Sequence, residues 1–302
     1  MFAPNEISPV APQWCGGFLL LKIYLSGIIA YIIMVKRNFV EMLRVVCVKN
    51  GWEISALSDE WVSQITNPKL NKIIRVVGYS FPLNIYVAAY SANDKGLTND
   101  LLERAGVPHV KHSFVYSDTL RMRIKTENTL EYDVQLSVDT YGLPVVVKPC
   151  KGSEGGGVSL CNSMSEVLEK TQEISKTEDV CLSPFEESEF EYRFYMLDDQ
   201  VLLAYKKVRG GDWRHNLSLG AVPVVIDAHK FPDMISLARR AMLVLGLHIG
   251  AVDIFDTVDG LKVLEVNNGV TLTHFAAISE DNYQTALDVY EKYLLASFAA
   301  LN

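Results

Sequence analysis

The chain has 302 residues, of which 49% are hydrophobic and 21% are charged, so it is long enough to build more than one folded lobe and is not intrinsically disordered. Its 28 basic and 36 acidic residues give a formal net charge of -8, which excludes the large positive surface that nucleic-acid binding requires. The 5 cysteines form no CxxC pair, which excludes a zinc knuckle and favours a reducing cytoplasm.

The first apolar segment covers residues 18–35 and is interrupted only by Lys22 and Ser26. Its length is at the lower limit of about 18 residues for a membrane span. Three interpretations stay open: a membrane anchor that keeps the rest of the chain cytoplasmic, a buried helix, or sequence upstream of the natural start at Met34. We treat residues 1–33 as a hydrophobic extension, and we expect a cytoplasmic protein that meets a membrane only if the segment is an anchor.

Helices and strands alternate after Met34. A first helix carries apolar residues at helical spacing and ends at Asn50-Gly51. The later pattern predicts strands over 72–79 and 145–148, a pair of strands over 194–207, and helices over 98–105, 163–174 and 232–245. No internal repeat interrupts this order, so the chain is predicted to be one α+β unit of enzyme size.

A glycine-rich segment follows an apolar strand that ends at Lys148. Backbone amides without side chains can surround phosphate oxygens. It is not a Walker A loop, because no Lys-Ser or Lys-Thr pair follows the last glycine and strand residues come next. We expect a hairpin that closes over a triphosphate, with an ordinary mobile hairpin as the alternative. The loop contains Gly152, Ser153, Gly155, Gly156 and Gly157.

A second hairpin lies near the C-terminus. Glu265 and Asn267 are two residues apart on its second strand and so project from one face. A three-residue loop, Val258 to Gly260 with Gly260 left-handed, would place Asp253 opposite Glu265, whereas a two-residue turn at Asp259-Gly260 would place Asp253 opposite Val266; we expect the longer loop. The oxygens gathered in this way suit Mg2+, with Mn2+ as a second choice. An exposed hairpin with solvated acids is the alternative.

The segment between the two hairpins concentrates charge. Glu191 and Arg193 have the same parity on a predicted strand. A basic cluster follows them and suits phosphate charge, although a solvated basic loop would have the same composition. None of the histidines has zinc-ligand spacing, although His215 and His274 fall near the expected cleft. The basic cluster consists of Lys206, Lys207, Arg209 and Arg214.

With these motifs in order, residues 92–302 resemble the ATP-grasp superfamily, and most of all its ribosomal-protein glutamate ligases and glutathione synthetase-like enzymes. The matching segments are NDKGLTNDLLERAGVP, VVVKPCKGSEGGGV, SPFEESEFEYR, DWRHN, and VDIF followed by VLEVNNG. The resemblance implies an ATP-grasp fold of class α+β, in which a central lobe (92–183) and a C-terminal lobe (184–302) grip ATP. A short α/β lobe (34–91) would precede them.

The resemblance also implies roles for particular residues. The implied catalytic residues are Lys148, Arg214 and Asn216, and the implied ligands of Mg2+ are Asp253, Glu265 and Asn267. The SPFEESEFEYR segment would be the adenine hinge, in which the backbone of residues 183–186 contacts the base and Glu191 contacts the ribose. The expected nucleotide contacts, with one lysine of the basic cluster included, are Lys95, Lys148, Ser153, Gly155, Gly156, Gly157, Ser183, Phe185, Glu186, Glu191 and Lys206.

The implied reaction is ATP-dependent joining of a carboxylate to an amine through an acyl phosphate, with release of ADP and phosphate. The substrates would be small molecules or peptides. An ATP-grasp phosphotransferase acting on a hydroxyl group and a non-catalytic nucleotide-binding module are the alternatives. The hinge contains Pro184, which has no N–H group, and the common proline-glycine loop after Asn267 is replaced by NGVTLTHFA. The region before residue 92 is short, so the carboxylate would be small or partly held by another copy of the chain.

Overall fold

The computed structural model describes residues 20–25, 28–33, 38–152 and 155–301, and it divides their strands among four sheets. β1 (Leu20–Leu25) and β2 (Ile28–Ile33) form an antiparallel hairpin. The helix considered over residues 18–35 is therefore wrong for these two stretches, whose β-branched and aromatic residues favour strands. None of the helices in the described ranges is long and apolar enough to cross a bilayer. The interpretation of residues 1–33 as an extension stays a prediction.

The first compact unit is helix α1 (Phe39–Asn50) followed by an antiparallel meander. The Asn38 side chain accepts a hydrogen bond from the Glu41 amide and so caps the helix N-terminus. Gly51 ends the helix with φ 68°, as the sequence predicts. The meander consists of β3 (Glu53–Leu57), β4 (Val62–Asn67) and β5 (Lys72–Val77).

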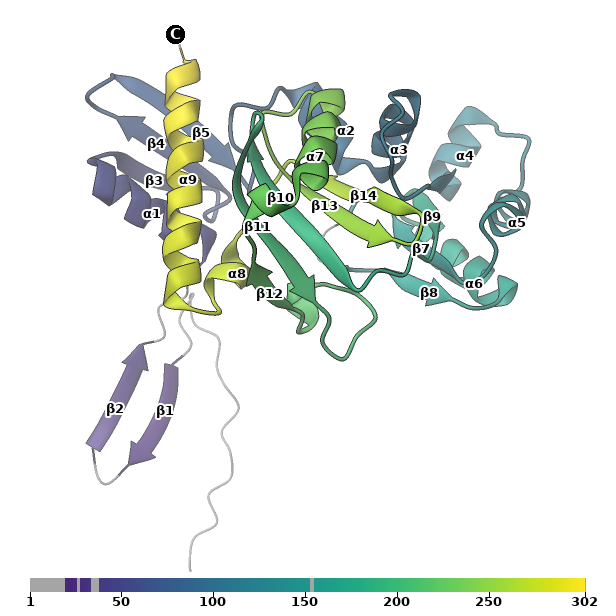
Figure 1. Cartoon of the computed structure of the whole chain (residues 1–302), viewed down its shortest axis with the longest axis horizontal. Coiled ribbons are helices and arrows are strands. Elements are labelled where there is room, and N and C mark those ends of the chain that lie inside the picture. The colour runs from purple at the N-terminus through teal and green to yellow at the C-terminus, as the bar shows by residue number, and fades with distance from the viewer. Residues whose placement is uncertain (1–19, 26–27, 34–37, 153–154, 302) are drawn as a thin grey trace, which may run out of the picture.

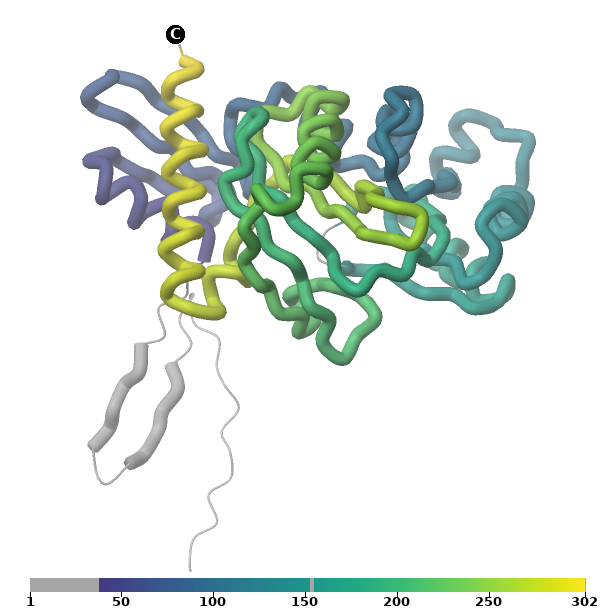
Figure 2. The backbone as a smooth tube through the Cα atoms, in the orientation of Figure 1, coloured from purple at the N-terminus to yellow at the C-terminus, as the bar shows by residue number. Residues whose placement is uncertain are grey.

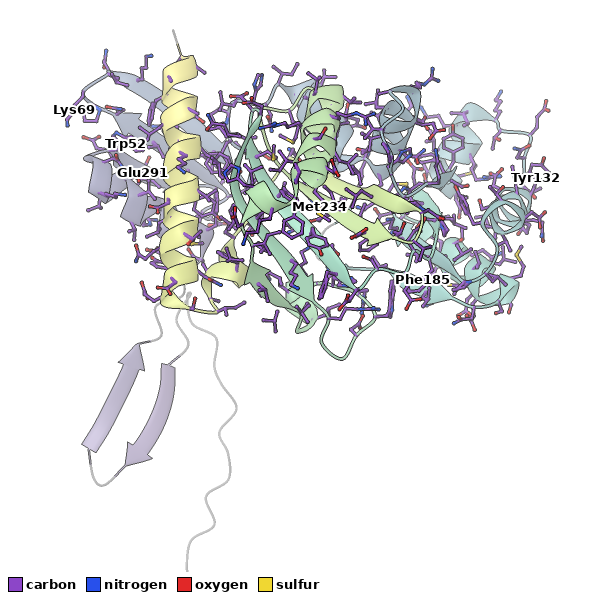
Figure 3. The ribbon with its side chains drawn as sticks, viewed as in Figure 1. Trp52, Lys69, Tyr132, Phe185, Met234 and Glu291 are labelled. Atoms are coloured by element: carbon purple, nitrogen blue, oxygen red, sulfur yellow. The ribbon has the colours of Figure 1, made fainter. Side chains whose placement is uncertain are left out.

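The long helix α9 (Glu280–Ala300) packs against α1 and β5, although it lies at the other end of the chain (Figure 1). Trp52 and Phe298 meet edge to face with ring centroids 5.0 Å apart, and Figure 3 shows Trp52 beside α9. The first unit therefore shares its core with the C-terminal part of the chain. The division at residues 34–91, 92–183 and 184–302 stays a prediction about folding units.

A four-stranded antiparallel sheet with strand order β6-β9-β7-β8 forms the central lobe. Helices α4 (Asp118–Ile124), α5 (Leu130–Tyr141) and α6 (Met164–Ser175) accompany it. Ser163 caps α6 by accepting from the Glu166 amide, in agreement with the predicted helix start. The strands are β6 (Ser113–Val115), β7 (Val145–Pro149), β8 (Ser159–Cys161) and β9 (Val180–Pro184).

The five-stranded antiparallel sheet lies between the central lobe and the unit of α1 and α9 (Figure 2). One of its faces packs on three helices: α2 (Tyr86–Asn93), α3 (Lys95–Arg104) and α7 (Pro232–Leu245). Helix α3 starts three residues before the predicted Thr98, because the Asp94 side chain caps it by accepting from the Leu97 amide. In sheet order the strands are β12 (Val222–Val225), β11 (Gln200–Val208), β10 (Phe190–Leu197), β13 (Ile249–Thr257) and β14 (Gly260–Asn267).

The other face of this sheet has two different halves. Tyr195, Tyr205 and Ala251 belong to the apolar core that α1 and α9 complete. Two residues further along the strands the same face carries Arg193, Lys207 and Asp253, and Glu191 lies two residues beyond Arg193. The helix-packed core therefore stops halfway along this face, and the polar half is left for a site.

The loop between β13 and β14 differs from the prediction. Thr257 pairs with Gly260, so the loop has two residues, Val258 and Asp259, and the predicted three-residue loop is wrong. Gly260 has φ 105°, and the Thr257 hydroxyl donates to its carbonyl at 2.8 Å. The threonine bond closes the tighter turn.

The predicted pairing of Asp253 with Glu265 is nevertheless present. The register shifts between Asp253 and Ile254, because Ile254 pairs with Val263 and leaves Leu264 as an extra residue on β14. With the shorter loop alone, Asp253 would pair with Leu264. The bulge adds one residue to β14 and so brings Glu265 opposite Asp253. The two carboxylates therefore share one face for a different reason from the expected one.

Replacing Leu294 tests whether α9 stabilises the whole chain. Its side chain is fully buried in the shared core, whereas Leu295 is 49% exposed. We expect Leu294→Ala to lower the free energy of unfolding by about 2 to 5 kcal/mol and Leu295→Ala to change it by less than about 0.5 kcal/mol. Urea unfolding measures both changes. Equal effects of the two variants would contradict the packing of α9.

Candidate active site

A cavity of about 270 Å³ opens between the polar half of the five-stranded sheet and the four-stranded sheet. Most of the residues that the sequence singled out line it, although they come from segments far apart in the chain. Ser153 lies outside the described residues, and Gly157 and Lys206 are not among the lining residues. The expected residues that line the cavity are Lys95, Lys148, Gly155, Gly156, Ser183, Phe185, Glu186, Glu191, Arg214, Asn216, Asp253, Glu265 and Asn267.

Two lysines face the cavity from its central-lobe side. Lys148 is buried on β7, and burial followed by repulsion from Lys95 lowers the pKa of its ammonium group. The Lys95 Nζ atom lies 3.2 Å from Glu265 and donates to the carbonyl of Gly152 at 3.1 Å. Burial opposes its charge, yet the Glu265 carboxylate raises the pKa of Lys95. Lys95 therefore links the glycine segment to the acidic hairpin as a cation.

The glycine segment is held by the DWRHN segment. Gly155 has φ 73°, and a Cβ atom there would lie 3.1 Å from the amide group of Asn216, so only glycine fits this approach. Arg214 donates to the carbonyl of Gly155 at 3.3 Å and pairs with Asp212 at 2.9 Å. The hydrogen bonds from Arg214 lower the pKa of Asp212 to about 2. This places an ionised guanidinium group against the loop.

A buried network of four charges forms the floor of the cavity. Arg193 donates to both carboxylate oxygens of Asp253, with a Nε to Oδ1 distance of 2.6 Å. Lys207 pairs with Glu191 and also lies 3.5 Å from Asp253. Sheet register places Arg193 opposite Asp253 and Glu191 opposite Lys207. Two cations face two carboxylates, which is the condition for burying such groups without a large electrostatic cost.

The two buried acids titrate differently. Burial raises the pKa of Asp253, but Arg193 and Lys207 outweigh it and hold that pKa below its usual value. Burial raises the pKa of Glu191 to about 7, and Lys207 opposes this shift. Asp253 is therefore ionised near neutral pH, whereas Glu191 changes its charge there.

Three oxygen-bearing side chains converge above this floor. Glu265 lies opposite Asp253, and the Asn267 Nδ2 atom lies 3.5 Å from an Asp253 oxygen. The described part of the chain contains no group of three or more His, Cys, Asp or Glu side chains that could hold a metal. A hard cation at this place would use the amide oxygen of Asn267 and would need further oxygens from a ligand or water.

Aromatic rings line another part of the cavity. The Phe185 ring meets Trp213 edge to face at 5.9 Å, and Figure 3 places Phe185 near the junction of the two sheets. Pro184 has no N–H group, and the Phe185 amide donates to the Pro144 carbonyl at 3.3 Å. Burial lowers the pKa of His215 to about 4, so its ring is neutral where it lines this part of the cavity.

The two adjacent lysines of the basic cluster lie differently. The Lys206 ammonium lies 3.8 Å from the centre of the Phe190 ring, whereas Lys207 lines the cavity. Lys207 has the parity of Tyr205 and pairs with Glu191, so the strand register decides which of the two lysines faces the cavity. A nucleotide contact from Lys206 stays a prediction. The lining residues Tyr79, Tyr195 and Phe275 were missed, since they lie within ordinary apolar runs.

Comparison with known proteins gives three results. A family model described as a RimK-like ATP-grasp domain matches residues 92–288. A probable alpha-L-glutamate ligase of Stutzerimonas stutzeri (strain A1501) is 29% identical over 221 residues, which cover 71% of this chain and 67% of the relative. Another, from Pseudomonas fluorescens (strain Pf-5), is 30% identical over 193 residues, which cover 62% of this chain and 59% of the relative. The chain thus spans 59% to 67% of the length of these two relatives.

Solved structures share the fold at low sequence identity. D-alanine–D-alanine ligase from Bacillus anthracis complexed with ATP gives a TM-score of 0.52 at 19% identity, covering 70% of this chain and 69% of the other. A bifunctional glutathione synthetase from Pasteurella multocida gives a TM-score of 0.53 at 13% identity, covering 86% of this chain and 45% of the other. The ATP-grasp fold of class α+β that was expected from the sequence is therefore confirmed.

Glu191 gives the site a test that depends on pH. Burial raises its pKa from 4.5 to about 7, so the folded chain holds a proton that the unfolded chain releases between these values. This contribution to stability is complete below the lower value and is lost as pH rises through the upper one, at about 1 kcal/mol per pH unit. We expect Glu191→Gln to remove this slope in urea unfolding across the window. The exposed neighbour variant Glu189→Gln should keep it, and an unchanged slope in Glu191→Gln would contradict the assignment.

Proposed function

The chain belongs to the RimK-like ATP-grasp family, and on that premise we propose that it is an ATP-dependent ligase that joins a carboxylate to an amine. The observation that carries the proposal is the convergence of the glycine segment, Lys148 and the acidic hairpin on one cavity. Anionic phosphates need all three, because they must be surrounded by amides, neutralised by cations and bridged to a metal.

The lining residues suggest how the nucleotide would be oriented in the cavity. The apolar slot at Phe185 and His215 suits the adenine ring, and Glu191 lies next to it for the ribose. Arg193 lies two residues beyond Glu191 on β10, about 7 Å further along the strand, and pairs with Asp253. The phosphates would lie beside these two residues. The glycine segment would cover the phosphates from the opposite side.

Cations supply most of the catalytic effect in this proposal. Lys95, Lys148 and Arg214 would face the β- and γ-phosphates and offset the charge that develops during transfer. A bound triphosphate would counter the burial that lowers the pKa of Lys148 and so keep it charged. Lys95 and Arg214 are already held in place by hydrogen bonds and ion pairs, which spares reorganisation during the reaction.

Asp253, Glu265 and Asn267 fit Mg2+, or Mn2+ as a substitute. Their donors are hard oxygens on one face of a hairpin, and they leave coordination positions for phosphate oxygens. When bound, the metal would draw negative charge away from the transferred phosphoryl group. Arg193 and Lys207 would fix the Asp253 carboxylate from below.

The reaction then follows from the alignment of three reactants. A carboxylate oxygen attacks the γ-phosphorus, the bond to the β-γ bridging oxygen breaks, and ADP leaves. The resulting acyl phosphate is attacked at its carbonyl carbon by an amine nitrogen. The carbon-oxygen bond to phosphate breaks, phosphate leaves with the electron pair, and the amine releases its proton to solvent.

We propose amino acids or small peptides as the carboxylate and amine substrates. The relatives are named probable alpha-L-glutamate ligases, so amino acids and small peptides form the first pool to test. A cytoplasmic location and self-association of the chain stay predictions from the sequence.

Turnover in a defined pool tests the function. The chain is incubated with ATP, Mg2+ and pooled amino acids and peptides, ADP release is followed, and new condensation products are identified by mass. Glu265→Gln should lower ADP release by about a hundredfold or more while circular dichroism stays unchanged, because it removes an ionised oxygen donor. Glu187→Gln, at an exposed position, serves as the matched control.

Three results would contradict this account. A stable phosphorylated product without an amide would indicate a phosphotransferase. ATP binding without ADP release in any pool would indicate a non-catalytic module. Full activity in Glu265→Gln would refute the metal assignment.

A further inference from the structure

The imidazole ring of His112 carries a buried atom without a partner. His112 directly precedes β6 and lines a second, small cavity of about 10 Å³, and Lys95 and Glu265 line both this cavity and the larger one of the candidate active site. Within the described part of the chain, the Nε2 atom of His112 is buried and forms no hydrogen bond. Such atoms are rare in native proteins, because the hydration lost on burial is not replaced. The Nε2 atom therefore needs a partner that a short side-chain movement can bring to it.

Neighbouring contacts fix where this ring lies. The His112 amide donates to the side-chain oxygen of Asn99 at 2.9 Å, and Asn99 belongs to α3, the helix that begins at Lys95. Gly96 on the same helix packs so closely against β6 that a Cβ atom there would lie 2.4 Å from the Phe114 ring. The position of the His112 ring is therefore set by the helix that also carries Lys95.

The His112 ring is an uncharged acceptor. Burial, followed by the charges of Lys148 and Lys95, holds the pKa of His112 well below its usual value, and a hydrogen bond with the Val110 backbone only partly opposes this. A neutral imidazole ring donates through one nitrogen and accepts through the other. Since the Val110 bond leaves Nε2 unpaired, Nε2 is the accepting nitrogen.

Two donors that line the small cavity are already engaged. The Thr98 hydroxyl donates to the Ser91 carbonyl at 2.8 Å. The Lys95 ammonium contacts Glu265 at 3.2 Å and donates to the Gly152 carbonyl at 3.1 Å. Either group would have to give up a contact in order to serve Nε2.

Lys148 has the complementary deficit. It is buried, and among the residues that the structure describes its ammonium group forms no ion pair. Cys181 pairs with Phe114 on one side and with Lys148 on the other, so these three side chains share one face of the four-stranded sheet. His112 lies two residues before Phe114 and shares that face. A donor without an acceptor and an acceptor without a donor therefore lie on the same face, and the lysine stem is flexible enough to join them.

We infer that His112 is a positioning residue of the nucleotide site, whose Nε2 atom accepts a hydrogen bond from the Lys148 ammonium and holds it against the phosphates of ATP. A neutral acceptor orients the ammonium without cancelling its charge, whereas a carboxylate at this place would compete with the phosphates for it. This role rests on the nucleotide binding in the proposed function and does not depend on which acid and amine are joined.

Binding of a fluorescent ATP analogue tests this role without turnover. The whole chain is titrated with mant-ATP in the presence of Mg2+, and Kd is measured for the wild type and each variant. His112→Leu should raise Kd about tenfold, because a hydrogen bond to a charged group is lost. His112→Gln should keep Kd within about threefold of the wild type, since its amide oxygen can take the place of Nε2. His229→Leu, at an exposed position outside both cavities, is the matched control and should leave Kd unchanged.

A double-mutant cycle identifies the donor. Lys148→Met removes the ammonium group and should itself raise Kd. Because His112 acts through Lys148, adding His112→Leu to Lys148→Met should change Kd by less than about twofold. A further tenfold loss in that background would assign Nε2 to another donor, such as a bound water, and would overturn the pairing.

Other results would also overturn the inference. A wild-type Kd in His112→Leu would do so and leave the ligase proposal intact. A tenfold loss in His112→Gln as well would exclude the acceptor role. A lower melting temperature of His112→Leu would indicate a structural role instead, because removal of an unpaired buried atom should not destabilise the chain. A wild-type chain that does not bind mant-ATP would overturn this inference and the proposed function together.

Discussion

The ion pair between Arg193 and Asp253 is the contact on which the rest of the site depends. It joins neighbouring strands of the five-stranded sheet at a position where the Asp253 side chain is 1% exposed and the Arg193 side chain is 22% exposed. Burying this pair is tolerable because Lys207 and Glu191 complete a network of two positive and two negative groups. The network holds the Asp253 carboxylate in place and lowers its pKa, which is what its proposed role as a metal ligand requires.

The same sheet face explains how packing prepares function. Towards Tyr195 and Ala251 the face is sealed by α1 and α9, and towards Glu191 and Asp253 it is open. The strand period of two therefore places a packed apolar half and a charged half on the same face of β10. The N-terminal unit takes part in this arrangement through Tyr79, because α9 holds that unit against the sheet.

Several parts of the fold and of the candidate site could be predicted from short stretches of the sequence. The capped helix ending at Gly51, the glycine segment after Lys148 and the shared face of Glu265 and Asn267 follow from residue types and spacing alone. The pairing of Asp253 with Glu265 was predicted for the wrong reason, since neither the short loop nor the bulge that compensates for it leaves a clear mark on the sequence.

Contacts between distant segments were harder to predict. The choice between Lys206 and Lys207 required the strand register, which depends on the partner strand. The rings that border the cavity come from segments far apart in the chain, and an apolar run carries no sign of which of its rings will border a cavity; they are Tyr79, Tyr195, Tyr205 and Phe275. The apolar stretch near the N-terminus has the composition of a helix or a strand, and its described parts pair as strands.

The most direct measurement is a crystal structure of the chain with a non-hydrolysable ATP analogue and Mn2+, whose anomalous scattering locates the metal. The account predicts the metal about 2.0 to 2.3 Å from oxygens of Asp253, Glu265 and Asn267 and from oxygens of two phosphates, with the base beside Phe185. A nucleotide bound elsewhere, or a metal remote from Glu265, would contradict it.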